Sequence, residues 1–336
     1  MEQHIIKFDN NIRMEAVALP ELKSDEVLIK IKYSVISNGT EKACLLEEEN
    51  TKNVPERFGY SGVGHIVKIG SGVKNIKEGD RVFAAYIGHA DYGIRRATSV
   101  WKIPDSVSFE DAIFTKLASF PLLALRRSRF EPGESVAIVG TGMLGILGVQ
   151  LAQIFGALPV ISLGGSREER IKKAKEFGAD YALSNNDPEL VKRIINITKK
   201  HTMFSGVNVV IDTSGAEDAL HKALKYTANN GRIVLNGCNR TSKKPINLYQ
   251  DVHLKGISII GANNGNRPQN NSSPYNWTTQ RDYKALLQWM AMGKLRPSGL
   301  ISEYASPNDY KTVFDRLLND REFPLGVLFD WDNFTP

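Results

Sequence analysis

Cysteine is scarce in this 336-residue chain, with only Cys44 and Cys238 present. Two cysteines this far apart exclude a disulfide framework and a cysteine-rich zinc site, and they are typical of a protein from a reducing compartment. Long hydrophobic runs are also missing, so no segment has the length of a membrane span. Residues 2–7 lack the apolar centre of a signal peptide. We therefore expect a cytoplasmic protein without a membrane partner.

Blocks of like charge are absent as well. The chain has 43 basic and 37 acidic side chains, which gives a net charge of +6, and the basic residues are dispersed. Two interpretations stay open: an ordinary solvated surface, or a modest attraction for anionic ligands such as phosphates. No motif supports nucleic-acid binding. A hydrophobic content of 42% is ordinary for a globular protein, and the length suffices for two domains.

The most informative feature that is present is the glycine-rich stretch 140–145, GTGMLG. It follows a short apolar run at 135–139, which predicts a strand, and it opens a helical pattern at 143–155. A strand, a glycine-rich turn and a helix are the context that the dinucleotide-binding fingerprint requires. The alternative, a purely structural tight turn, explains this combination less well.

The three glycines of the fingerprint have separate tasks. Gly140 permits the tight turn, Gly142 lets a pyrophosphate approach the backbone, and Gly145 lets the helix pack closely on the strand. We expect Met143 and Leu144 to present their backbone N–H groups to the phosphates at the positive end of the helix dipole.

The chain changes character at about residue 110. Before it, the alternating segment 27–33 and the segments 62–69 and 81–86 predict strands separated by glycine-containing turns. After it, strands and helices alternate, which favours a doubly wound parallel sheet and an α/β fold. The predicted strands are 159–163, 207–211, 231–235, 256–260 and 325–329, and the predicted helices are 167–177, 217–227, 279–292 and 310–318, with a further helix capped by Asp187 and started by Pro188.

Several stretches resemble motifs of the medium-chain dehydrogenase/reductase superfamily, and they follow in its order. These stretches are 59–70 (GYSGVGHIVKIG), 73–82, the fingerprint, 174–180, 209–215 (VVIDTSG) and 231–237 (GRIVLNG). The resemblance implies a β-rich GroES-like catalytic domain, formed by residues 1–115 and 276–336, and a Rossmann dinucleotide-binding domain at 116–275. It also implies that Ser214 and Asn236 contact the nucleotide.

The segment 34–41 (SVISNGTE) narrows the resemblance to a zinc-free branch. This branch includes bacteriochlorophyllide-dehydrogenase-like proteins and oxidoreductases of polysaccharide biosynthesis. Where zinc-dependent members have their ligands, this chain has Ser37, Tyr60 with its neighbour Ser61, and a residue near Lys116. Neutral hydroxyls and a cation are poor ligands for Zn²⁺, and the segment 86–101 contains no cysteine lobe. We therefore expect no metal ion.

Without zinc, a side chain must stabilise and protonate the alkoxide that hydride transfer creates. Tyr60 is the first candidate, because it occupies the place of a metal ligand; the alternative is a packing tyrosine beneath the cofactor. Lys116 is either a cation beside it, the acid itself, or a solvated lysine. Thr40 matches a hydroxyl position that relays a proton or touches the nicotinamide ribose, unless it only bonds its own turn.

The candidate substrate residues are Ser37, Glu41, Asn263 and Arg267. Glu41 either orients Lys116, binds a sugar hydroxyl, or is a surface acid. Asn263 and Arg267 belong to the polar stretch 263–276, which reads as a loop whose side chains meet substrate hydroxyls or a phosphate, or are merely solvated.

The region about 20 residues beyond the fingerprint indicates whether the chain prefers NAD(H) or NADP(H). NAD-preferring sites have an acid there for the ribose 2′-hydroxyl, whereas this chain has glycine at 164–165. Ser166, Arg167 and, less directly, Arg170 suit a 2′-phosphate, because the guanidinium fork matches its oxygens. This favours NADP(H) over NAD(H), although the acids at 168–169 are also within reach of the ribose.

Three functions fit these residues. The leading hypothesis is a zinc-independent, NADP(H)-preferring oxidoreductase of secondary alcohols and ketones, with sugar or cyclitol derivatives as candidate substrates. The alternatives are an NADPH-dependent reductase of activated C=C bonds, like quinone and enoyl reductases, and a nucleotide-binding protein without turnover. The resemblance also implies a homodimer, with the apolar strand at 256–260 as a candidate sheet edge.

Overall fold

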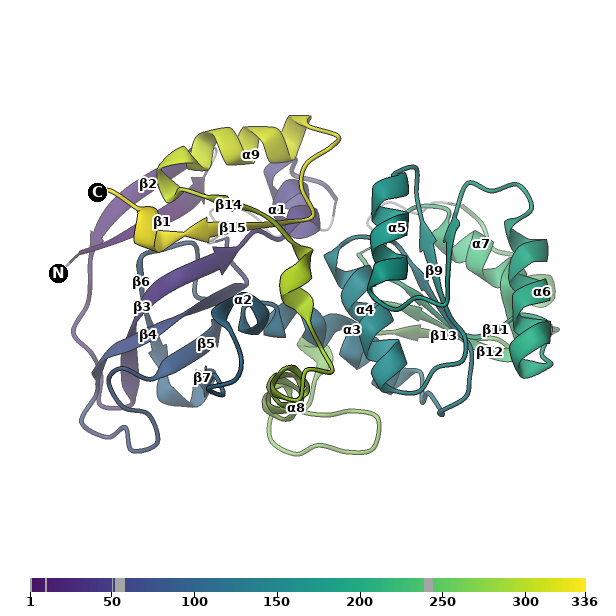
Figure 1. The fold of residues 1–336 in the computed structure, drawn as a ribbon, viewed down its shortest axis with the longest axis horizontal. Helices are drawn as coiled ribbons and strands as arrows, with labels where there is room; N and C mark the ends of the chain where they lie inside the picture. Colours follow the sequence, from purple (N-terminus) through teal and green to yellow (C-terminus); the bar gives the residue numbers. More distant parts are fainter. Residues whose placement is uncertain (1, 10, 50, 52–57, 239–243) are drawn as a thin grey trace. The chain divides into compact units, whose positions relative to one another are not determined.

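A computed structural model describes residues 2–9, 11–49, 51, 58–238 and 244–336. The chain divides into two compact units, Met1–Lys116 with Tyr283–Pro336, and Leu117–Asp282. The first is built around a mainly antiparallel sheet and the second around a parallel sheet flanked by helices (Figure 1). The predicted α/β fold class is thereby confirmed.

The main sheet of the first unit has the strand order β14-β15-β3-β4-β5-β7, with β6 also paired to β3. Its strands are β3 (Glu26–Val35), β4 (Ser61–Ile69), β5 (Arg81–Ala85), β6 (Tyr92–Arg96), β7 (Val100–Lys102), β14 (Ile301–Ala305) and β15 (Gly326–Asp330). A separate hairpin comprises β1 (Glu2–Asp9) and β2 (Asn11–Ala18). The helices are α1 (Asn38–Leu45), α2 (Phe109–Ala112) and α9 (Tyr310–Asn319).

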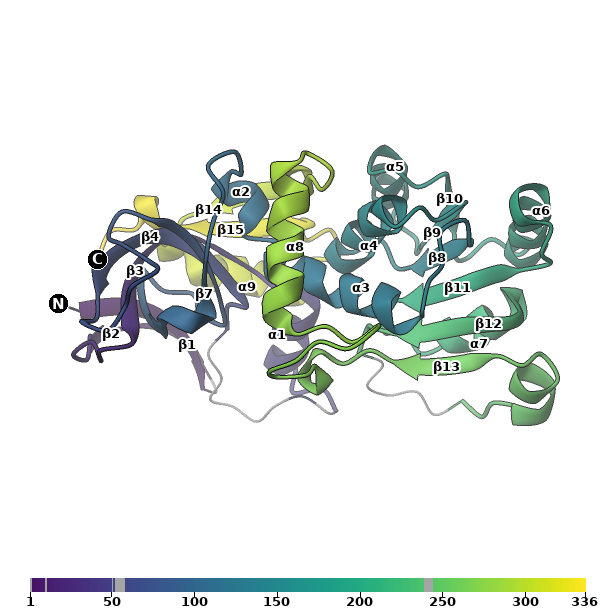
Figure 2. The same cartoon turned by 90° about the horizontal axis from the view of Figure 1, so that it is seen from below.

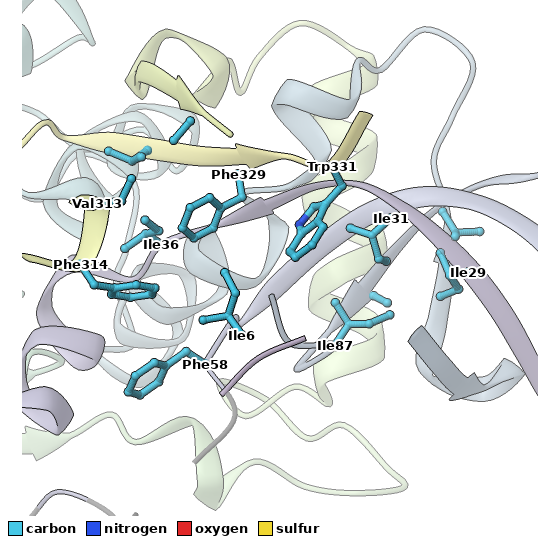
Figure 3. Packing of buried hydrophobic residues seen from close by; sticks show 14 of the residues in the cluster. Ile6, Ile29, Ile31, Ile36, Phe58, Ile87, Val313, Phe314, Phe329 and Trp331 are labelled. Carbon is cyan, nitrogen blue, oxygen red and sulfur yellow. The ribbon is translucent and has the colours of Figure 1, made fainter. Parts of the chain in front are cut away.

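Alternation along β3 builds the core of this unit. Val27, Ile29 and Ile31 are buried, whereas Lys30 between them is exposed, because successive side chains of a strand point to opposite faces. The buried residues meet aromatic side chains from α9 and β15, including Phe314 (Figure 3). Segments from both ends of the sequence therefore share one core.

The parallel sheet of the second unit has the order β10-β9-β8-β11-β12-β13. Its strands are β8 (Val136–Val139), β9 (Val160–Gly164), β10 (Tyr181–Ser184), β11 (Val207–Asp212), β12 (Thr227–Leu235) and β13 (Ser258–Gly261). The strand order reverses between β8 and β11, and nucleotides bind open α/β sheets in the crevice at such a reversal, beside the carboxyl ends of the strands. The topology therefore predicts a nucleotide site formed by the residues that follow Val139 and Asp212.

Helices cover both faces of the parallel sheet. The helices are α4 (Met143–Ile154), α5 (Glu168–Glu176), α6 (Leu190–Thr202) and α7 (Ala219–Tyr226), and the boundary between the units falls within α3 (Thr115–Arg127) and α8 (Thr279–Ala291). α4 and α5 lie on one face of the sheet, and α6 and α7 lie on the other (Figures 1 and 2). In the part of the chain that the structure describes, no helix has the length and apolarity to cross a bilayer.

One predicted helix start is wrong. The pair Asp187 and Pro188 predicted the N-terminus of a helix, but α6 begins at Leu190. The carboxylate of Asp187 instead accepts a hydrogen bond from the backbone N–H of Glu189 at 2.9 Å and pairs with Arg193. Asp187 thus shapes the turn that precedes the helix.

Candidate functional site

The glycine-rich turn after β8 is packed so tightly that only glycine fits at two positions. Gly140 has a φ of +106°, and a Cβ there would lie 2.9 Å from the Thr213 hydroxyl. A Cβ on Gly145 would lie 1.8 Å from the carbonyl oxygen of Gly140. The turn is also fixed to the neighbouring strand, because Thr213 donates its hydroxyl to the Val139 carbonyl at 2.8 Å.

Gly142 differs from the other two glycines. Its backbone is extended, and a Cβ built on it meets no atom within 4 Å. It is the N-cap of α4, where no side chain caps the first-turn N–H groups. Uncapped N–H groups at the positive end of a helix dipole form an anion site, and the space beside Gly142 lets a pyrophosphate approach them. Leu144, in the first turn, is half-buried, whereas Met143 is buried.

The carboxylate at the end of β11 holds the adjacent turn. Asp212 is buried and accepts hydrogen bonds from the backbone N–H of Ser214 at 2.9 Å and from its hydroxyl at 2.7 Å. Burial raises the pKa of Asp212, and these hydrogen bonds oppose that rise. Because Ser214 also accepts from the N–H of Ala216, its hydroxyl is engaged within the turn.

Asn236 follows β12 at the same edge of the sheet. Its amide nitrogen donates to the Phe120 carbonyl at 3.0 Å, which fixes the orientation of the side chain. The Oδ1 atom is buried and has no hydrogen-bond partner among the described residues. A buried acceptor left unpaired costs free energy, so this oxygen suits a donor on a bound ligand.

The end of β9 is where an acid would be expected in an NAD-preferring site. A Cβ on Gly164 would lie 2.3 Å from the Ile171 side chain, so no larger residue fits there. A Cβ on Gly165 meets nothing within 4 Å. Ser166 is exposed, Arg167 is the half-buried N-cap residue of α5, and Arg170 lies in the first turn of this helix. Glycine therefore leaves open space beside a hydroxyl and two cationic side chains.

These features of the second unit fit a dinucleotide. The two glycines that exclude a Cβ and the uncapped helix N-terminus follow β8, beside the strand-order reversal. The unpaired Asn236 oxygen follows β12 at the same edge of the sheet.

Tyr60, Tyr86 and Lys116 form a cluster in the first unit. The rings of Tyr60 and Tyr86 meet edge to face at 5.5 Å between centroids. The Nζ atom of Lys116 lies 4.5 Å from the centroid of the Tyr86 ring, a cation–π geometry. Only 3% of the Lys116 surface is exposed, so it is not a solvated lysine. The structure thus brings the two predicted residues together through a tyrosine that sequence analysis did not identify.

Tyr86 is held in a backbone conformation that side chains rarely adopt. Its φ is +55°, although 54% of its surface is exposed. The N–H of Tyr86 donates to the Tyr60 carbonyl at 2.8 Å, and its own carbonyl accepts from Arg95. Left-handed conformations of non-glycine residues persist where the surroundings fix them, and they are frequent at functional sites. The predicted strand 81–86 ends one residue early for this reason.

The residues at the start of α1 lie in different surroundings. Ser37 is buried at the N-cap, where its side chain makes no capping bond, and Thr40 is half-buried in the first turn. Glu41 was expected near Lys116, at a substrate hydroxyl or on the surface. It is instead buried and lies 3.3 Å from Nε2 of His89. Its carboxylate is therefore occupied within the core of the first unit.

The loop residues Asn263 and Arg267 are placed differently from the expectation of a shared substrate surface. Asn263 is exposed and caps a short 3₁₀ turn by accepting from the N–H of Gly265 at 2.7 Å. Arg267 is buried, and its guanidinium donates to Asn264, to the carbonyls of Ser119 and Trp277, and to the carboxylate of Asp282. Because four of its five donors are engaged inside the protein, Arg267 holds the loop rather than a ligand.

Removal of this side chain should cost stability rather than affinity. We expect Arg267→Ala to lower the free energy of unfolding by about 3–5 kcal/mol, because it breaks a buried ion pair with Asp282. Arg281→Ala is the matched control: this exposed arginine stacks on Trp277, a contact of about 0.5–1 kcal/mol. Urea unfolding of both variants measures the difference. Equal losses would contradict a structural role for Arg267.

Metal ligands are not gathered in the described part of the chain, where no group of three or more His, Cys, Asp or Glu side chains is arranged to hold an ion. The family resemblance places Ser37, Tyr60, Ser61 and Lys116 at or near the positions of zinc ligands, and hydroxyls and an ammonium do not suit Zn²⁺. Two histidines lie near these positions in the sequence. His65 packs on the Phe109 ring, and the ring nitrogens of His89 lie within hydrogen-bond distance of Ser34 and Glu41.

Family models and known proteins agree with this architecture. Residues 23–105 match the alcohol dehydrogenase GroES-like domain, and residues 144–291 match the zinc-binding dehydrogenase domain. An alcohol dehydrogenase from Geobacillus stearothermophilus is 28% identical, with 93% of each chain covered.

Two solved structures are similar over nearly the whole chain. One, from Escherichia coli CFT073, is described as a short chain alcohol dehydrogenase in complex with NADH; its TM-score is 0.82 at 20% identity, with 98% of this chain and 99% of that chain covered. The other, from Sinorhizobium meliloti 1021, is described as a zinc-binding dehydrogenase bound to NADP; its TM-score is 0.81 at 20% identity, with both chains fully covered.

Fold and site together define an NAD(P)-dependent oxidoreductase. The chain belongs to the medium-chain dehydrogenase/reductase superfamily.

Proposed function

We propose that this protein is a zinc-independent, NADP(H)-preferring oxidoreductase that interconverts a secondary alcohol and a ketone, with sugar or cyclitol derivatives as the candidate substrate class. The observation that carries this proposal is the cluster of Tyr60, Tyr86 and the buried Lys116. It supplies a phenol and an ammonium at positions where zinc-dependent members of the superfamily have metal ligands.

The chemistry follows from this donor set. A bound NADPH would supply the hydride that reduces the carbonyl carbon, so the protein must supply a proton to the carbonyl oxygen. The Tyr60 hydroxyl donates its proton to that oxygen, and the ammonium of Lys116 stabilises the tyrosinate that remains. Thr40, in the first turn of α1, is proposed to hydrogen-bond the nicotinamide ribose or to relay the proton from solvent. In the oxidative direction each step reverses.

The preference for NADP(H) rests on the end of β9. The open space beside Gly165 is large enough for a substituent, and Ser166 and Arg167 follow directly. A 2′-phosphate placed there would accept charge-assisted hydrogen bonds from Arg167 and a hydrogen bond from Ser166. The ribose 2′-hydroxyl of NAD would lack a carboxylate acceptor at positions 164 and 165, which are both glycine.

Gly165→Asp should reverse this preference. The aspartate side chain fits the open space, accepts from a ribose 2′-hydroxyl and repels a 2′-phosphate. Such a like-charge contact costs several kcal/mol, so we expect the ratio of kcat/KM for NADPH over NADH to fall by at least about a hundredfold. Steady-state kinetics with both cofactors measure the ratio. An unchanged ratio would show that the 2′-phosphate binds elsewhere.

The proposed activity is tested with the purified protein, NADPH and a panel of ketones, polyol-derived ketones and enones, with product identification. Carbonyl-to-alcohol conversion that persists after chelator treatment, with no stoichiometric metal by elemental analysis, supports the proposal. Loss of α,β-unsaturation would identify a C=C reductase, and nucleotide binding without turnover would identify a binding protein. Activity that depends on one metal ion per chain would overturn zinc independence.

We also propose that the protein is a homodimer. β13 is the edge strand of the parallel sheet, and Ile259 on it is exposed. An exposed apolar edge strand offers unpaired backbone groups to a second copy. Light scattering coupled to size-exclusion chromatography determines the mass: a monomer at micromolar concentration would contradict the proposal.

A further inference from the structure

A buried chain of polar side chains crosses the core of the first unit. The indole Nε1 of Trp331 lies 3.0 Å from Oγ of Ser34, which lies 2.8 Å from Nδ1 of His89. Nε2 of His89 lies 3.3 and 3.4 Å from the two carboxylate oxygens of Glu41. All four side chains are buried, and Trp331 lies among the apolar residues of the core (Figure 3).

The hydrogen-bond direction in this chain is fixed by the chemistry of its first member. An indole N–H only donates, so Ser34 Oγ accepts from Trp331. The Ser34 hydroxyl then donates to Nδ1 of His89, and no second acceptor for it lies among the described residues. His89 therefore has its proton on Nε2, where it donates to Glu41. Three successive donors point toward one carboxylate.

The network joins two segments that bear residues of the proposed reaction. Glu41 follows Thr40 on α1, and its N–H donates to the Ser37 carbonyl at 2.9 Å. The His89 segment pairs with the segment that leads to Tyr60, through the bond from the His89 N–H to the Phe58 carbonyl at 2.9 Å.

The His89 segment and the Tyr60 segment are packed so closely that their backbones cannot shift independently. The N–H of Gly88 donates to the Gly59 carbonyl at 3.2 Å, and a Cβ on Gly59 would lie 2.4 Å from the carbonyl carbon of Gly88. A shift of His89 is therefore transmitted to the backbone beside Tyr60.

A packing role alone does not account for these residue types. A buried carboxylate is costly unless hydrogen bonds compensate it, and apolar side chains of similar volume fill a core without that cost. The imidazole ring is already enclosed by aromatic neighbours, with the Phe329 ring centroid at 5.2 Å. The polar network adds a specific geometry to the packing. The Glu41–His89 hydrogen bond holds α1 at a fixed distance from the segment that leads to Tyr60.

We propose that Glu41 and His89 are positioning residues, which set the separation between the hydroxyls of Thr40 and Tyr60. The proposal rests on the function proposed above for these hydroxyls. Loss of the Glu41–His89 contact lets α1 move relative to the Tyr60 segment, and a misplacement of about 1 Å costs about a hundredfold in rate. Nucleotide affinity changes little, because all the residues assigned to the nucleotide except Thr40 lie in the second unit.

The kinetic test compares Glu41→Ala with Glu41→Gln, and Glu47→Gln on the exposed turn after α1 is the control. We expect Glu41→Ala to lower kcat for ketone reduction by about tenfold to a hundredfold, with a much smaller change in the Kd for NADPH. Glu41→Gln should regain most of the loss, because its amide oxygen still accepts from His89. Wild-type kcat in Glu41→Ala, or equal losses in both Glu41 variants, would overturn the proposal.

Two measurements remain informative if turnover is absent or if Glu41→Ala does not fold. ¹⁵N NMR of the wild-type protein should show one pyridine-type signal, Nδ1, and one pyrrole-type signal, Nε2, for His89; a proton on Nδ1 would contradict the proposed hydrogen-bond direction. In protein labelled with 3-fluorotyrosine, the ¹⁹F signal of Tyr60, assigned with Tyr60→Phe, should move in Glu41→Met, whose apolar side chain of similar length removes the acceptor for His89. The signal should stay close to its wild-type position in Glu41→Gln and in Glu47→Gln. An unmoved signal in Glu41→Met would refute positioning, whereas failure of the ketone assay alone would refute only the proposed function.

Discussion

Replacement of Gly142 by valine should abolish NADPH binding while the protein remains folded. The Gly142 backbone is extended, which any residue adopts, and a Cβ there meets no protein atom within 4 Å. Loss of the glycine N-cap destabilises the folded protein, whereas valine stabilises it by reducing the conformational freedom of the unfolded chain. Because these effects oppose each other, we expect the free energy of unfolding to stay within about 1 kcal/mol of wild type. The valine side chain would occupy the space through which a pyrophosphate reaches the N-terminus of α4.

Gly145→Ala is the comparator for this variant, because it changes the same turn in the opposite way. Its Cβ would overlap the Gly140 carbonyl oxygen at 1.8 Å, so α4 must move away from β8 and stability must fall. Isothermal titration with NADPH and urea unfolding separate the two effects. Wild-type affinity in Gly142→Val would show that the phosphates do not bind at this helix terminus.

Local periodicity explains which elements the sequence could predict. Residues 29–33 of β3 alternate between buried and more exposed side chains, and the fingerprint joins an apolar strand to a helix, so short stretches specify both. α3 was not predicted, because Pro121 lies inside it and proline normally ends a helix. There the surrounding structure prevails: every residue from Leu117 to Leu125 except Phe120 is buried, so packing supports the helix.

The arrangement of the site was less accessible from sequence than its residue types. Glu41 and His89 are 48 residues apart, and only the folded sheet brings them together. Arg267 is in a polar, asparagine-rich stretch that suggests solvent exposure, yet its partner Asp282 lies on a helix that begins after the loop. Charge and polarity indicate that a side chain needs a partner, but they do not say whether that partner is solvent, ligand or protein. The left-handed backbone of Tyr86 has no signal in the sequence, since no glycine or asparagine marks it.

Tyr60→Phe should reduce turnover by about 10²–10⁴-fold, the usual contribution of a positioned proton donor. The ring remains, so its edge-to-face contact with Tyr86 and the packing of the cluster are preserved. Because the variant lacks only the hydroxyl, kcat should fall while the Kd for NADPH stays unchanged. The free energy of unfolding should change by no more than about 1.5 kcal/mol, the upper end of what one hydrogen bond contributes. Stopped-flow measurement of NADPH oxidation in a single turnover isolates the chemical step from product release.

Tyr86→Phe decides whether the proton comes from Tyr60 or from its neighbour. This variant keeps the aromatic face over the Lys116 ammonium and removes the other hydroxyl of the cluster. If Tyr60 is the donor, Tyr86→Phe retains most of the wild-type rate and Tyr60→Phe does not. The reverse order would assign the donor to Tyr86, whose exposed ring and constrained backbone then have a direct catalytic purpose. Wild-type rates in both variants would leave Lys116 as the acid, because its ammonium is the remaining donor in the cluster of Tyr60, Tyr86 and Lys116.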